Sequence, residues 1–87
     1  KIVLLDDHST IFLLPNKFEK WYTKNTPISL IPIGKVTGIT TQNLFYPLNN
    51  EELTIGYRTG SSNHVTEDGI VKIEHSQGDL ILMECFD

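Results

Sequence analysis

Short apolar runs separated by polar, turn-forming residues are the dominant pattern along the chain. Two apolar runs at 2–5 and 11–14 flank five polar residues, which predicts a β-hairpin. Val71 and Ile73 alternate with Lys72 and Glu74, as in a strand with one buried face. The same reasoning places further strands near 28–33, 35–40, 44–46, 53–58, 65–66, 70–74 and 79–86.

The segment after Pro15 follows a helical pattern. Asn16 followed three residues later by Glu19 is typical of a helix start, and the polar residues before Pro27 would end the helix. We therefore predict a short helix whose aromatic face packs on the sheet. Helical spacing separates its aromatic side chains from its lysines, with Phe18, Trp21 and Tyr22 on one face and Lys17, Lys20 and Lys24 on the other.

Composition supports the dominance of strands. Of 87 residues, 10 are Ile, 4 are Val and 9 are Thr, whereas Ala is absent. We predict one domain over residues 1–87 with a mainly β (α+β) fold, a small antiparallel barrel or strongly curled sheet with one short helix packed on it. The size suits an OB-like or SH3-like barrel. The excess of Ile, Asn and Lys over Ala and Arg suggests a viral or low-GC bacterial source.

The charge is acidic and unevenly distributed. The formal net charge is −4, yet residues 8–46 contain four lysines against one glutamate, and residues 47–87 contain two basic side chains against eight acids. The sequence has no apolar run long enough to span a membrane and no signal-peptide pattern. Its single cysteine, Cys85, cannot form an internal disulfide. We expect a soluble, cytoplasmic protein that does not bind membranes.

No constellation of residues predicts catalysis. The histidines, His8, His64 and His75, lack the spacing of metal ligands. Neither Cys85 nor the serines lie in a nucleophile motif, and no glycine loop is followed by a phosphate-binding lysine. We therefore predict that the protein is not an enzyme and has no catalytic, metal or cofactor site.

A cluster of aromatic residues beside Pro47 is the leading candidate for a binding surface. Aromatic side chains are enriched in interface cores, although these could equally be ordinary strand residues. The primary hypothesis is a non-catalytic module that binds a protein partner or associates with itself. The predicted partner-binding residues are Phe45, Tyr46, Leu48 and Tyr57.

The alternative hypothesis is a small β-barrel that binds single-stranded nucleic acid through the predicted basic and aromatic helix. Lysines would contact phosphates and an indole would stack on a base. Two observations oppose it: the aromatic stripe also suits a core-facing side, and the net negative charge repels nucleic acid. The residues assigned to this alternative are Lys17, Lys20, Trp21, Lys24 and Lys35.

Overall fold

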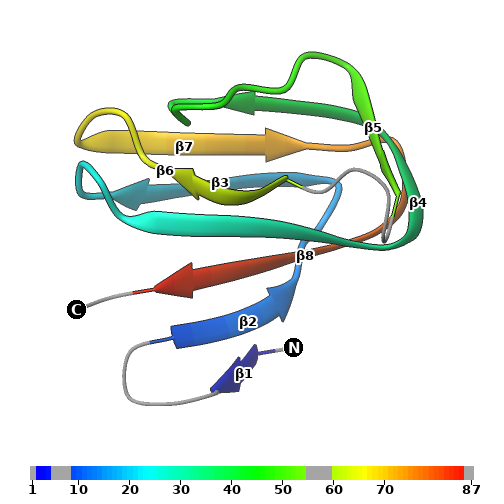
Figure 1. The fold of residues 1–87 in the computed structure, drawn as a ribbon, viewed down its shortest axis with the longest axis horizontal. Helices are drawn as coiled ribbons and strands as arrows, with labels where there is room; N and C mark the ends of the chain where they lie inside the picture. Colours follow the sequence, from blue (N-terminus) through cyan, green and yellow to red (C-terminus); the bar gives the residue numbers. More distant parts are fainter. Residues whose placement is uncertain (1, 5–8, 55–59, 86–87) are drawn as a thin grey trace.

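The computed structural model describes residues 2–4, 9–54 and 60–85, and all the regular elements in them are β-strands (Figure 1). Every strand pair is antiparallel. The eight strands are β1 (Ile2–Leu4), β2 (Ser9–Leu13), β3 (Lys17–Tyr22), β4 (Pro27–Gln42), β5 (Glu51–Thr54), β6 (Gly60–His64), β7 (Gly69–Glu74) and β8 (Gln77–Cys85).

The long strand β4 organises the fold. Strand order is β1-β2-β8-β4-β7-β3, with β5 and β6 also paired to β4. The first half of β4 pairs with β8 and β6, and its second half pairs with β7 and β5. Because one strand belongs to both halves, the sheet curls into a half-barrel, as Figure 1 shows.

The bend in β4 depends on glycine. The pairing of β4 with β8 shifts register between Ile33 and Thr37, close to Gly34 and Gly38, whose φ angles are 73° and 68°. A Cβ on Gly38 would lie 2.3 Å from Ser76 Oγ, so this position needs both the left-handed conformation and the missing side chain. Past the bend, the partner of β4 changes from β8 to β7, and the sheet curls around a shared interior.

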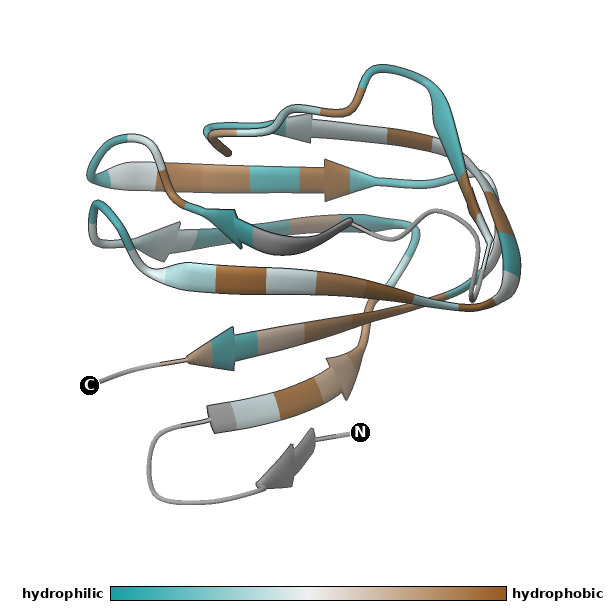
Figure 2. Cartoon of the chain, viewed as in Figure 1, coloured by the Kyte–Doolittle hydropathy of each residue, from teal (hydrophilic) through white to brown (hydrophobic). Residues whose placement is uncertain are grey.

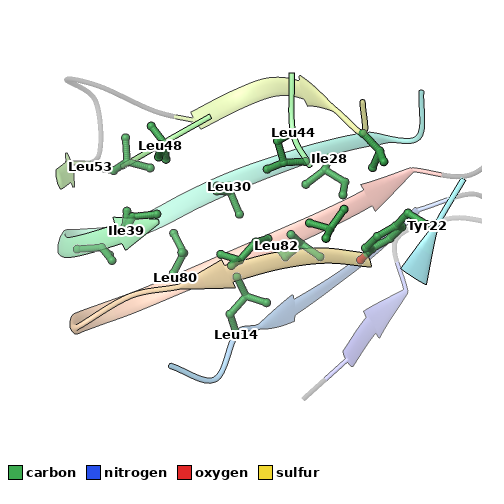
Figure 3. Packing of buried hydrophobic residues seen from close by; sticks show 14 residues of the cluster. Leu14, Tyr22, Ile28, Leu30, Ile39, Leu44, Leu48, Leu53, Leu80 and Leu82 are labelled. Carbon is green, nitrogen blue, oxygen red and sulfur yellow. The ribbon is translucent and has the colours of Figure 1, made fainter. Parts of the chain in front are cut away.

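The core lies in this interior. Alternate residues of β4, β7 and β8 point inward, and Figure 2 shows hydrophobic residues recurring along these strands. In Figure 3, Leu53 lies at one end of the cluster and Tyr22 at the other. The buried cluster comprises Leu14, Tyr22, Ile28, Leu30, Val36, Ile39, Leu44, Leu48, Leu53, Val65, Val71, Ile73, Leu80 and Leu82.

The predicted helix at 17–24 is wrong. Residues 17–22 form β3, which pairs with β7 from Lys17 opposite Glu74 to Tyr22 opposite Gly69. The proposed cap, Asn16, instead donates its side-chain amide to the carbonyls of His75 and Ser76. A two-turn helix has little stability of its own, whereas as a strand the segment pairs with β7 over its whole length along one edge.

The predicted mainly β, curled antiparallel sheet is confirmed. The two strands expected at 28–33 and 35–40 are one continuous strand, β4, and Leu44 forms an isolated bridge with Val65. Part of the strand expected at 53–58 lies outside the described residues. Within the part of the chain that the structure describes, no helix is long and apolar enough to cross a membrane.

Candidate functional site

Two aromatic rings project from the segment that joins β4 to β5. Phe45 is 53% exposed and Tyr46 is 60% exposed. The Phe45 ring stacks on His64 of β6 with 4.7 Å between centroids, and meets Tyr46 edge to face at 4.8 Å. We call Phe45, Tyr46 and His64 the aromatic ledge. Exposed and mutually packed rings of this kind are suited to binding a flat ligand.

The backbone beneath the ledge is anchored on both sides. A hydrogen bond from the Phe45 amide to the His64 carbonyl, 2.9 Å, attaches the segment to the end of β6, and the Leu44–Val65 bridge attaches it to the residue that follows. Farther along, Leu48 and Thr41 exchange two hydrogen bonds. Leu44 and Leu48 are both buried, so apolar side chains fix the segment while its rings remain outside. Leu48 therefore belongs to the core and does not lie on the exposed surface where it was predicted.

A buried asparagine reinforces the ledge. Asn63 is only 5% exposed. Its Oδ1 accepts hydrogen bonds from the amides of Tyr46 and His64, both 2.9 Å, and its Nδ2 donates to the Tyr46 carbonyl at 2.8 Å. One side chain thus connects the backbones of two of the ledge residues.

A second polar cluster lies inside the half-barrel, around Glu84 of β8. Glu84 is 3% exposed, and accepts hydrogen bonds from Thr10 Oγ1 at 2.8 Å, from Lys20 Nζ at 2.7 Å and from the Tyr22 hydroxyl. These partners come from β2 and β3, which are not neighbours in the sheet. The cluster therefore joins β3 to the β2–β8 side of the curled sheet through side chains. The Phe12–Phe18 ring contact, 5.6 Å between centroids, spans the same two strands.

The surroundings of Glu84 set its charge state. Burial raises the pKa of Glu84, but the hydrogen bonds from Lys20, Tyr22 and Thr10, together with the Lys20 charge, outweigh burial and lower the pKa overall. For Tyr22, burial, the hydrogen bond to Glu84 and the negative charge of Glu84 all raise the pKa. An ionised carboxylate and a neutral phenol therefore persist together at neutral pH, which suits a structural tie between strands.

The residues assigned to nucleic-acid binding do not form one surface. Alternation along β3 puts Lys17 and Trp21 on the outer face, while Lys20 faces inward to Glu84. Lys24 follows β3 and Lys35 lies on β4, and both are close to carboxylates: Lys24 Nζ is 3.9 Å from Glu67, and Lys35 Nζ is 3.7 Å from Glu52.

The support that Asn63 and His64 of β6 give to the ledge was not predicted from the sequence. The sequence offered His64 only as a possible metal ligand, and no pattern singled out Asn63. An asparagine and a histidine within a polar segment give no local signal of burial or ring stacking, since both depend on the partner strand. Tyr57, the fourth predicted partner-binding residue, lies outside the described residues. The described residues contain no group of three or more His, Cys, Asp or Glu side chains arranged to hold a metal ion.

The curled sheet corresponds to a class of vitamin-binding domain. Residues 15–80 match the family described as thiamin pyrophosphokinase, vitamin B1 binding domain. This match covers most of the chain and includes the whole ledge and β3 to β7. The chain belongs to this family.

Solved structures share the fold. The thiamine pyrophosphokinase of Bacillus subtilis superposes with a TM-score of 0.82 at 24% identity, covering 95% of this chain and 40% of that one. The Candida albicans thiamin pyrophosphokinase gives 0.79 at 18% identity, with 93% and 32% covered. The yeast enzyme gives 0.73 at 24% identity, with 91% and 28% covered. The chain therefore spans well under half of these proteins. No curated protein matches it.

These matches overturn the function predicted from the sequence. Neither a non-catalytic protein-interaction module nor a single-stranded nucleic-acid binder agrees with membership of a vitamin B1 binding family. The prediction that the protein is not an enzyme is also contradicted, because the family and its structural neighbours are thiamin pyrophosphokinases, of which this chain corresponds to the small binding domain. A binding domain needs only a recognition surface, and the residue types on such a surface do not by themselves identify the ligand.

Proposed function

We propose that this chain is the thiamin-binding domain of a thiamin pyrophosphokinase and that the aromatic ledge contacts the vitamin. The observation that carries the proposal is the exposed ring pair of Phe45 and Tyr46, held rigidly on a scaffold whose family binds vitamin B1. Phe45 and Tyr46, two of the four residues predicted as a partner-binding surface, thereby become candidates for contact with a small molecule.

The chemistry of thiamin suits such a surface. The vitamin carries a flat aminopyrimidine ring and a positively charged thiazolium ring. Aromatic faces stack on the first and attract the second through their negative π-clouds, an interaction of about 0.5–2 kcal/mol for each well-placed ring. The net charge of −4 also favours the approach of a cation.

The role of this domain in the reaction is recognition and orientation. A pyrophosphokinase transfers a pyrophosphoryl group to the thiamin hydroxyl, and such transfers depend strongly on positioning the acceptor. The ledge would hold the rings of thiamin and leave its hydroxyethyl arm free to meet the donor. We also keep in the proposal the cytoplasmic location expected from the sequence.

Titration calorimetry with thiamin on the intact protein tests this function. We expect the wild-type protein to bind thiamin and Tyr46→Ala to bind it at least about tenfold more weakly, since the substitution removes the more exposed ring. Trp21→Ala is the matched control because Trp21 is a 55% exposed aromatic residue on β3, and it should leave the affinity unchanged. A folded wild-type protein without thiamin affinity, or an equal loss in both variants, would overturn the proposal.

A further inference from the structure

We propose that Asn63 is a positioning residue for the thiamin surface, acting through the backbone of Tyr46 without touching the ligand. The inference rests on the proposed function of the ledge. The Phe45 and Tyr46 side chains are more than half exposed, whereas the asparagine bonded to the Tyr46 backbone is only 5% exposed. A buried side-chain amide needs hydrogen-bond partners, and among the described residues those of Asn63 are backbone groups of Tyr46 and His64.

The hydrogen bonds of Asn63 fix both backbone polar groups of Tyr46. The Tyr46 amide donates to Asn63 Oδ1 and the Tyr46 carbonyl accepts from Nδ2, at 2.9 and 2.8 Å. In a β-sheet, the amide and carbonyl of one residue are paired in this way by the backbone of a neighbouring strand. Here a single side chain pairs with both groups. A primary amide supplies a donor and an acceptor side by side, so neither a carboxylate nor a hydroxyl reproduces the pair.

The same oxygen also accepts a bond from the His64 amide at 2.9 Å. His64, which stacks on Phe45, is therefore hydrogen-bonded to the same Asn63 side chain that holds the Tyr46 backbone. A movement of the Tyr46 backbone out of its observed position would break two hydrogen bonds to a buried side chain, where unpaired polar groups are costly. Because Asn63 fixes the backbone that carries the Tyr46 ring in advance, less conformational entropy is lost when a ligand binds.

Asn16 provides a comparison within the same chain. Its Nδ2 donates to two backbone carbonyls, those of His75 and Ser76, at 3.0 and 3.1 Å. This pairing lies just beyond the end of β7, whereas the ledge lies near the start of that strand. Substitution of either asparagine removes side-chain-to-backbone hydrogen bonds, but only Asn63 bonds to the ledge.

The experiment compares Asn63→Ala, Asn63→Asp and Asn16→Ala in the intact protein. Calorimetry gives the thiamin affinity, urea unfolding gives the stability, and amide hydrogen exchange by NMR reports on Tyr46 and His64. We expect Asn63→Ala to bind thiamin about tenfold more weakly, with faster exchange at both amides. Asn63→Asp keeps the acceptor and should preserve much of the amide protection and part of the affinity, and it decides the matter if the alanine variant does not fold. Asn16→Ala should retain wild-type affinity even where it unfolds at lower urea.

The outcomes separate this inference from the proposed function. If the wild-type protein does not bind thiamin, or if Tyr46→Ala binds it normally, the ledge is not the site and both proposals fail. If Tyr46→Ala loses affinity but the folded Asn63 variants bind like the wild type, only the positioning role is overturned. A loss of affinity in Asn16→Ala equal to that in the Asn63 variants would mean that general stability controls binding, which also overturns it.

Discussion

The Glu84 cluster and the aromatic ledge both depend on one buried polar side chain, but they use it in opposite ways. Glu84 is charged and faces inward, and it joins strands that the backbone leaves unpaired. Asn63 is neutral and bonds to the backbone of a segment whose side chains remain outside. The difference indicates that the first site serves stability and the second serves presentation of exposed rings. Substitutions at the two sites should therefore separate stability from binding.

The largest expected effect is that of Glu84→Ala on stability. The substitution leaves Lys20, Tyr22 and Thr10 without their common acceptor and opens a cavity, so the free energy of unfolding should fall by about 3 kcal/mol. Urea denaturation measures the loss. Glu84→Gln is the control, because it keeps the shape and part of the hydrogen bonding and should cost less. Equal stability of Glu84→Ala and the wild type would show that the cluster does not hold β3 in place.

Acid should weaken the same cluster by a smaller amount. Because folding lowers the pKa of Glu84, its contribution is fully present above the unfolded-state value of 4.5 and is lost as the pH falls through the folded-state value. Urea denaturation between pH 7 and pH 2.5 should show the difference in stability between wild type and Glu84→Gln shrinking below about pH 4.5. Asn63→Ala, which removes a neutral side chain, should keep the wild-type pH dependence. A constant difference between wild type and Glu84→Gln would contradict this assignment.

The smallest effect on stability is expected at the ledge. Phe45→Ala removes a half-exposed ring that stacks on His64 and meets Tyr46, and it should lower the free energy of unfolding by about 1 kcal/mol or less. Its thiamin affinity should nevertheless fall severalfold, because the stacked surface is lost. Glu84→Gln should show the converse, with lower stability and unchanged affinity in the folded protein. Reversal of these two results would remove the distinction between the regions.

The helix prediction failed because a charged pair inside the half-barrel obscures the alternation of two strands. Along β3, Phe18, Lys20 and Tyr22 share the inner face, and the lysine hides what would otherwise be a strand alternation. Along β8, Glu84 interrupts the inward series begun by Leu80 and Leu82 in the same way. Taken alone, each charged residue breaks the apolar pattern of its strand. In the fold the two form an ion pair, with 2.7 Å between Lys20 Nζ and Glu84 Oε2. The pair is separated by 64 residues, so no local pattern reveals it.

The sequence by itself determined the β-rich composition, most of the strands and the choice of Phe45 and Tyr46 as a candidate surface. These features depend on residue type and on spacing over a few residues, which the chain carries locally. The tertiary structure alone decided that residues 17–22 form a strand, that Leu48 is buried, and that Asn63 and His64 support the ledge. Those outcomes arise from pairing between distant strands, where the energy of a polar residue depends on the partner that folding brings to it.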